Sequence, residues 1–282
     1  MDKSTEIINS TPIAWPTPSV RQPTPSMKKK IFQSLEEAFA VFDEDGGVEI
    51  ELPPIPQKED VQNQLIQNAL LLVDSGEYVL SRNILAEILK KNNECTEAIR
   101  WMGWCFKQEG QFSKAQKLYE RLIELRQTEQ DYFELGEVYY SLNDDIKAIH
   151  AWQEALTHSG SESPHLFDLY KGLGNAFTRN GDYESAEENY NKAHTLRNNS
   201  DALQVNFGSL AFQKQNYLQA MAYFKGALEI NPFNDRAWCG ISLVAREMKD
   251  FEWARATVLK AIDINPKNSS AVEILEVLDN GT

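Results

Sequence analysis

The sequence is poor in cysteine, in positive charge and in long apolar runs. Its three cysteines, Cys95, Cys105 and Cys239, are odd in number and widely spaced, which favours reduced thiols in the cytoplasm over a disulfide framework. The longest apolar run, Ala69–Val73, is far shorter than the roughly 18–20 residues of a membrane-spanning helix, so we expect no membrane insertion. Lys and Arg number 28 against 42 Asp and Glu, and this net charge of −14 argues against binding to nucleic acid.

The sequence also lacks the short motifs that carry catalysis or metal binding. The four histidines, His150, His158, His165 and His194, form no pair at helical spacing with a glutamate between them. The chain has no Cys-x-x-Cys, no glycine-rich phosphate loop after a strand and no Gly-x-Ser-x-Gly. We therefore expect a protein that is not an enzyme and that needs no cofactor or metal.

Residues 1–60 differ in composition from the rest of the chain. They hold most of the prolines, including Pro-Thr-Pro-Ser twice, from Pro16 and from Pro23, and they lack the apolar core of a secretory signal. We expect this segment to be a mostly disordered tail with one short amphipathic helix at residues 31–42. That helix could cap the remaining domain, fill its groove or bind a partner.

From residue 61 onward the chain repeats itself about every 34 residues. Small residues recur in one column, and a second small residue follows each of them after twelve positions. The first column is Ala69, Gly103, Gly136, Gly174, Gly208 and Ser242, and the second is Ser81, Ala115, Ala148, Ala186, Ala220 and Ala254. A large residue stands four positions after the second small one, as in Tyr119, Trp152, Tyr190 and Phe224. Close helix packing at the small positions, with large side chains between units, explains this pattern.

These columns resemble the tetratricopeptide repeat, a helix–turn–helix unit of 34 residues. The resemblance implies an all-α, right-handed superhelix of stacked units with a concave groove. We expect one solenoid at residues 61–282, with repeats at 62–95, 96–128, 129–162, 167–200, 201–234 and 235–268 and a capping helix at 270–279. The longer spacing before Gly174 predicts extra residues ahead of the fourth repeat, whose first helix we expect to start at Ser163-Pro164.

The resemblance also implies which residues face a ligand, because in this family certain positions of each first helix line the groove. At those positions the sequence has a set that is aromatic in its first half and more basic in its second. The set is Arg100, Trp104, Lys107, Phe133, Tyr140, Lys171, Asn175, Arg179, Asn206, Arg236 and Arg246.

Some members of the family hold acidic chain termini with a clamp of basic and asparagine side chains. Lys171, Asn175, Asn206 and Arg236 match the clamp pattern, whereas Gly240 stands where a second basic residue belongs. This departure puts tight capture of a terminal carboxylate in doubt and leaves general peptide binding open.

The sequence thus predicts a cytoplasmic scaffold, adaptor or chaperone that binds a segment of a partner protein in the groove, with the tail as a possible second binding element. The alternative is a structural assembly component that associates with itself through the solenoid and has no peptide client. The sequence leaves the partner and the oligomeric state open.

Overall fold

A computed structural model describes residues 58–280, and every regular element in that range is an α-helix. The predicted disordered tail and the predicted helix at residues 31–42 lie outside the described residues. The boundary that the sequence places at residue 60 stays a prediction.

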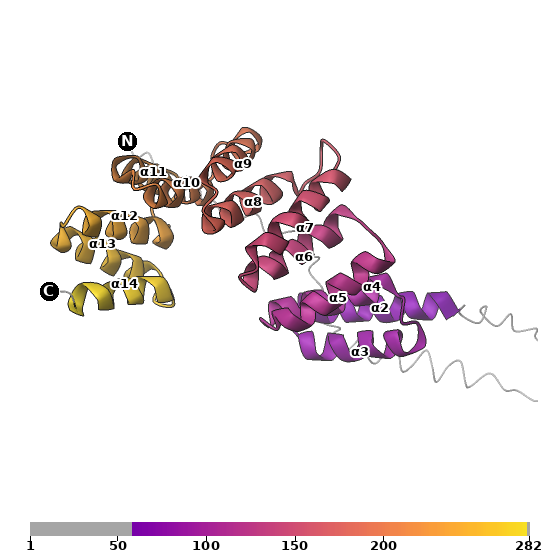
Figure 1. The fold of residues 1–282 in the computed structure, drawn as a ribbon. Coiled ribbons are helices and arrows are strands. Elements are labelled where there is room, and N and C mark those ends of the chain that lie inside the picture. The colour runs from indigo at the N-terminus through magenta and orange to yellow at the C-terminus, as the bar shows by residue number, and fades with distance from the viewer. Residues whose placement is uncertain (1–57, 281–282) are drawn as a thin grey trace, which may run out of the picture.

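The described helices form six consecutive pairs and one final helix. Figure 1 shows the pairs following one another in chain order along a curved path from α2 to α14, which confirms the predicted all-α solenoid. The pairs are α2 (Lys58–Asp74) and α3 (Tyr78–Lys91), α4 (Thr96–Gln108) and α5 (Phe112–Leu125), α6 (Glu129–Ser141) and α7 (Asp145–His158), α8 (Leu166–Asn180) and α9 (Tyr183–Leu196), α10 (Asp201–Gln213) and α11 (Tyr217–Ile230), α12 (Asp235–Glu247) and α13 (Phe251–Ile264), and the final helix is α14 (Ser269–Asn280).

The two helices of each pair are joined by a tight turn that needs one residue in the left-handed conformation. Gly76, Gly110 and Gly181 take it with φ of 79°, 70° and 83°. Glycine adopts these angles without steric cost, so the sequence signal for a chain reversal is confirmed at all three turns. The other three turns place non-glycine residues there, Asn143, Gln215 and Lys249, with φ between 59° and 63°.

In the third and fifth repeats the large residue packs against a glycine of its own pair and a glycine of the next one. A Cβ atom on Gly208 would lie 2.6 Å from the ring of Phe224, and one on Gly240, in the following repeat, 2.4 Å from the same ring. Trp152 likewise touches Gly136 of its own repeat and Gly172 of the next. Glycine is required at these positions because the rings occupy the space that a side chain would need.

The connection between α7 and α8 holds the extra residues that the spacing predicts, but α8 begins later than predicted. Its first residue is Leu166, preceded by His165, rather than a helix start at Ser163-Pro164. The Ser163 hydroxyl oxygen accepts a hydrogen bond from the backbone N–H of His165 and donates one to Glu129 of α6. Ser163 therefore organises the loop and joins it to the previous repeat, which the helix-start pattern did not reveal.

The last helix, α14, covers the second helix of the sixth repeat. Its buried residues, Ala271, Ile274 and Leu278, lie in one cluster with Ala254 and Val258 of α13. The apolar end of the sixth repeat is thereby shielded from water.

Candidate partner-binding groove

The first helices of neighbouring repeats lie side by side: α6 contacts α8, α8 contacts α10, and α10 contacts α12. Their exposed faces form one surface, on which three neighbouring cavities open. We call them the N-terminal, central and C-terminal cavities, and together the groove.

The N-terminal cavity lies over α4, α6 and α8 and has a volume of about 460 Å³. Aromatic side chains and paired charges line it together. Its lining includes Lys107, Phe133, Glu137, Tyr140, Trp152, Asp168, Lys171 and Asn175.

The central cavity lies over α8, α10 and α12 and has a volume of about 320 Å³. Hydroxyl and amide groups dominate its lining, which includes Tyr140, Asn175, Thr178, Arg179, Tyr190, Asn206, Ser209, Gln213 and Arg236. Such groups can donate to and accept from the backbone of an extended chain.

The C-terminal cavity, of about 610 Å³, lies between α10, α12, the α13–α14 connection and α14. Neighbouring cavities have lining residues in common. Tyr140 and Asn175 line both the N-terminal and the central cavity, while Ser209, Gln213 and Arg236 line both the central and the C-terminal cavity. The three cavities are therefore contiguous and form a path along the first helices.

Most predicted basic residues of the groove form ion pairs within the protein. The Nζ atom of Lys107 bonds to Glu134 and, at 2.7 Å, to Glu137. Burial lowers the pKa of Lys107, but the two carboxylates outweigh this effect and the net shift is upward. Lys171 pairs with Asp168 one turn earlier in α8. The N-terminal cavity is consequently close to neutral.

Arg179 joins the fourth repeat to the third. Its guanidinium lies 3.8 Å from the centre of the Tyr140 ring, donates to the Tyr140 carbonyl at 2.8 Å and pairs with Asp145. The hydrogen bond with Asp145 is the main cause of the raised pKa of Arg179. Arg179 therefore acts first as an inter-repeat contact.

The side chains of the predicted asparagines are hydrogen-bonded or buried, whereas that of Arg236 is exposed and unpaired within the described residues. Asn175 accepts a hydrogen bond from the Tyr190 hydroxyl at 2.8 Å, and Asn206 is buried with 4% exposure beneath the central cavity. Arg236 is exposed, and among residues 58–280 its side chain has neither a hydrogen bond nor an ion pair. It is therefore available to a ligand at the junction of the central and C-terminal cavities.

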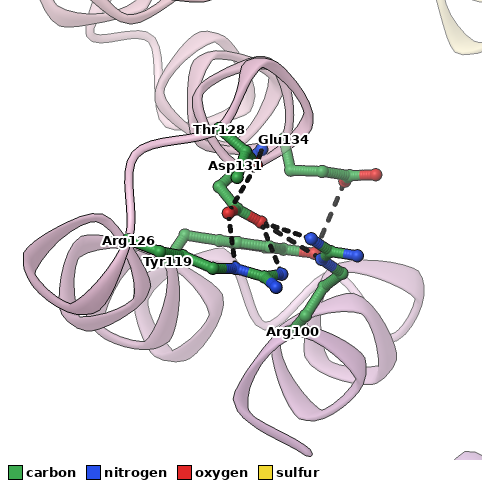
Figure 2. Close-up of polar contacts among 6 residues, drawn as sticks. All are labelled: Arg100, Tyr119, Arg126, Thr128, Asp131 and Glu134. Carbon is green, nitrogen blue, oxygen red and sulfur yellow. Dashed lines mark hydrogen bonds and ion pairs between the residues drawn. The ribbon is translucent and has the colours of Figure 1, made fainter. Parts of the chain in front are cut away.

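Three predicted groove residues line none of the three cavities. Trp104 packs edge-on against Tyr78 and Trp101, and Arg246 pairs with Glu247 at 3.0 Å. Arg100 turns inward to the carboxylate of Asp131, as Figure 2 shows. The structure thus brings eight of the predicted residues together, namely Lys107, Phe133, Tyr140, Lys171, Asn175, Arg179, Asn206 and Arg236.

The sequence reasoning missed several residues of the C-terminal cavity. Leu243 lies in α12, Lys267 in the α13–α14 connection, and Ile274 in α14. The repeat pattern did not predict Lys267 or Ile274, because both residues lie after α12, the first helix of the sixth repeat. The family pattern assigns no ligand contact beyond that helix.

Within residues 58–280 no group of three or more His, Cys, Asp or Glu side chains could hold a metal ion, and the three cysteines are buried and unpaired. No helix in that range combines the length and apolar character needed to cross a bilayer.

Family models for the tetratricopeptide repeat match residues 97–126, 168–200, 202–234 and 235–268. The chain contains tetratricopeptide repeats in these segments. These matches coincide with the helix pairs α4–α5, α8–α9, α10–α11 and α12–α13. Proteins with such repeats generally bind other proteins and are typically scaffolds without catalytic activity.

Two curated relatives share low sequence identity with the chain. The BBSome complex member BBS4 of Mus musculus is 24% identical over 252 residues, which cover 79% of this chain and 48% of that protein. The TPR repeat-containing protein YpiA of Bacillus subtilis (strain 168) is 27% identical over 209 residues, or 72% of this chain and 48% of that one. The chain therefore spans about half the length of these relatives.

Solved structures share the fold at still lower identity. PilW, a type IV pilus biogenesis factor, superimposes with a TM-score of 0.65 at 13% identity, covering 76% of this chain and 98% of that one. The Cut9–Hcn1 hetero-tetramer of the APC/C gives a TM-score of 0.63 at 16% identity, covering 77% of this chain and 42% of the matched chain. At this identity the likeness shows the fold alone.

Proposed function

We propose that this protein is a non-enzymatic, cytoplasmic scaffold, adaptor or chaperone that holds a segment of a partner protein in the groove. The observation that carries the proposal is the contiguous path of three cavities along the first helices. The path offers aromatic surface at its N-terminal end, amides and hydroxyls in its centre, and the unpaired cation Arg236 near its C-terminal end.

This lining suits an extended peptide better than a small metabolite. The cavities are open and elongated as a set, and their polar groups are spread over several repeats rather than converging on one point. The first helices lie on a preformed scaffold, so binding would order the partner segment but not the groove, which limits the entropic cost.

The charge pattern refines what the sequence predicted for the second half of the groove. Lys171 and Arg179 are compensated by Asp168 and Asp145, which leaves Arg236 as the predicted basic residue without a partner in the described chain. The positive charge of Arg236 attracts acidic groups to its own part of the groove. It therefore favours a partner segment whose acidic group lies next to Arg236.

The test uses peptides selected from a displayed random library on the full-length protein. We expect the selected peptides to lose about tenfold or more in affinity on the double change Lys171→Glu and Arg236→Glu, and to bind more weakly as salt rises. The matched control is Lys192→Glu with Lys260→Glu. These two lysines pair with Glu188 and Asp263 and line none of the three cavities, so the control has the same change in net charge. Equal affinity in both double variants would exclude the groove as the binding surface.

Self-association remains the second candidate because two large apolar side chains are strongly exposed. Leu218 and Phe233 have exposed fractions of 77% and 75%. Sedimentation velocity separates the two proposals: a monomer at micromolar concentration that binds selected peptides supports the scaffold, whereas a concentration-dependent oligomer that Leu218→Ser and Phe233→Ser dissolve supports self-association.

A further inference from the structure

The C-terminal cavity combines an apolar floor with cations at its rim. Phe212 of α10, Leu243 of α12 and Ile274 of α14 contribute apolar surface to its lining. Ile274 is 8% exposed, so it belongs to the packed core as well as to the cavity wall. A volume of about 610 Å³ leaves room for a large apolar side chain and the groups next to it.

Two cations line this cavity, and both are exposed. Arg236 is the second residue of α12, and Lys267 lies just before α14. Neither side chain forms an ion pair or a hydrogen bond with any residue that the structure describes. Both charges are therefore free to meet a ligand.

The one carboxylate in the lining is already occupied. Oδ2 of Asp235 accepts hydrogen bonds from Asn265 at 2.6 Å and from Asn268 at 3.0 Å. These two amides hold the connection to α14 against the start of α12 and draw the Asp235 charge away from the open space. The formal charge of the lining is thus one positive, since Arg236 and Lys267 outnumber Asp235.

We infer that the C-terminal cavity binds an apolar side chain adjacent to a carboxylate, at one end of the bound partner segment. The apolar side chain covers Phe212, Leu243 and Ile274, while the carboxylate lies between Arg236 and Lys267. Low-dielectric walls strengthen the attraction between these charges. The inference deepens the proposed function, on which it rests for the ligand being a protein segment, and it adds a site at the junction of the sixth repeat and α14.

The carboxylate can belong to a chain terminus or to an acidic side chain, and two probes distinguish these sources. N-acetyl-leucine presents a terminal carboxylate beside an apolar side chain, and N-acetyl-aspartyl-leucinamide presents a side-chain carboxylate. N-acetyl-leucinamide is the neutral control. Binding to the full-length protein is followed by the NMR shifts of its labelled Ile and Leu methyl groups.

We expect at least one anionic probe to shift the methyl signals of Ile274 and Leu243 and to bind about fivefold or more tightly than the neutral amide. That preference should vanish in the double variant Arg236→Gln with Lys267→Gln and persist in Lys260→Gln, which removes a charge on α13 away from the cavity. Equal binding of acid and amide, an unchanged preference in the double variant, or no shift at either methyl group would overturn the inference.

The probe experiment on the C-terminal cavity and the peptide experiment on the whole groove can fail independently. Library peptides that depend on the groove, together with probes that fail at Ile274, would leave the scaffold proposal intact and remove this site. The absence of any groove-dependent peptide would remove the scaffold proposal even if the probes bound.

Discussion

The carboxylate of Asp131 lies 3.0 Å from the guanidinium of Arg100, although the Asp131 side chain is completely buried. The same carboxylate pairs with Arg126 at 2.9 Å and accepts a hydrogen bond from the Thr128 hydroxyl at 2.6 Å. Figure 2 shows these groups converging on Asp131 from α4, from the connection after α5 and from α6. One buried charge thereby ties the second repeat to the third.

Removing this charge should weaken the joint between the two repeats. Asp131→Ala leaves Arg100 and Arg126 without their partner, which should lower the free energy of unfolding by about 3 kcal/mol in a urea titration. The control is Asp263→Ala, because the Asp263 side chain is 76% exposed and pairs only with Lys260 one turn away. A surface pair of this kind should cost less than about 0.5 kcal/mol. Similar losses in the two variants would show that the buried cluster does not hold the joint.

Two glycines within helices allow a second, internally matched test. A Cβ on Gly174 would lie 2.3 Å from the Tyr190 ring, whereas one on Gly226 of α11 would meet only the Gln204 side chain, at 3.4 Å. Gly174→Ala should therefore destabilise the protein by about 1–3 kcal/mol through overpacking. Gly226→Ala should be neutral or stabilising by up to about 1 kcal/mol, because alanine favours a helix. Melting temperatures that move in the same direction for both variants would contradict this packing.

The repeat period predicted the helices and the packing columns well, because both follow from local spacing. Side-chain partners across repeats were harder to predict, since they depend on how far neighbouring helices are offset and on which rotamers result. Arg100 occupies a groove position by count but turns to Asp131. A sequence signal existed, because Asp131 stands at a position where the second, fourth, fifth and sixth repeats have Ala98, Leu169, Leu203 and Ala237, all buried.

Asp145 gives the same lesson for the groove. The other second helices begin with an aromatic residue, namely Tyr78, Phe112, Tyr183, Tyr217 and Phe251, whereas α7 begins with Asp145. In the structure Asp145 pairs with Arg179 of the next repeat. The acidic residue at an otherwise aromatic position was therefore a sign of an ion pair within the protein, here between Asp145 and Arg179. The cations that remain available, Arg236 and Lys267, could be recognised only once the pairs were known.

Stability near the fifth repeat should depend on acid pH through Asp201. Burial raises the pKa of this carboxyl. Hydrogen bonds from Asn231 at 2.8 Å and Asn234 at 2.9 Å lower the pKa by more than burial raises it, so the net shift is downward. Because the folded pKa lies below the unfolded value of about 3.9, the contribution is present above that pH and is lost as the pH falls through the folded value.

The variant Asp201→Asn should isolate this contribution. We expect it to lower the free energy of unfolding by about 1 kcal/mol at neutral pH. The difference from the wild type should shrink once the pH falls below the unfolded pKa of about 3.9, and it should vanish only below the folded pKa. Urea titrations of both proteins at several pH values measure it. A difference that stays constant with pH would mean that Asp201 acts by packing rather than by its charge.

The outward face of α2 bears on whether the repeats fold without residues 1–55. In that helix Gln64 and Asn68 are exposed. The corresponding positions in the fourth repeat are Leu169 and Leu173, which are buried against neighbouring helices. Polar residues on the end of a repeat array are what a terminal repeat needs in water. Covering α2 with another helix would therefore bring little apolar burial apart from Val61 and Leu71, which are 45% and 49% exposed.

We accordingly predict that a chain starting at Pro56 folds as stably as the full-length protein. The helical circular dichroism from residues 58–280 should be unchanged. The melting temperature should stay within about 2 °C, since no large apolar surface is lost. The matched variant is full-length protein with Phe32→Ser and Phe39→Ser, which removes two apolar side chains from the predicted helix at residues 31–42 and leaves the length of the tail intact. If that helix caps α2, both changes must lower the melting temperature to a similar extent. If it serves a partner instead, both proteins keep their stability, and only capture of that partner declines.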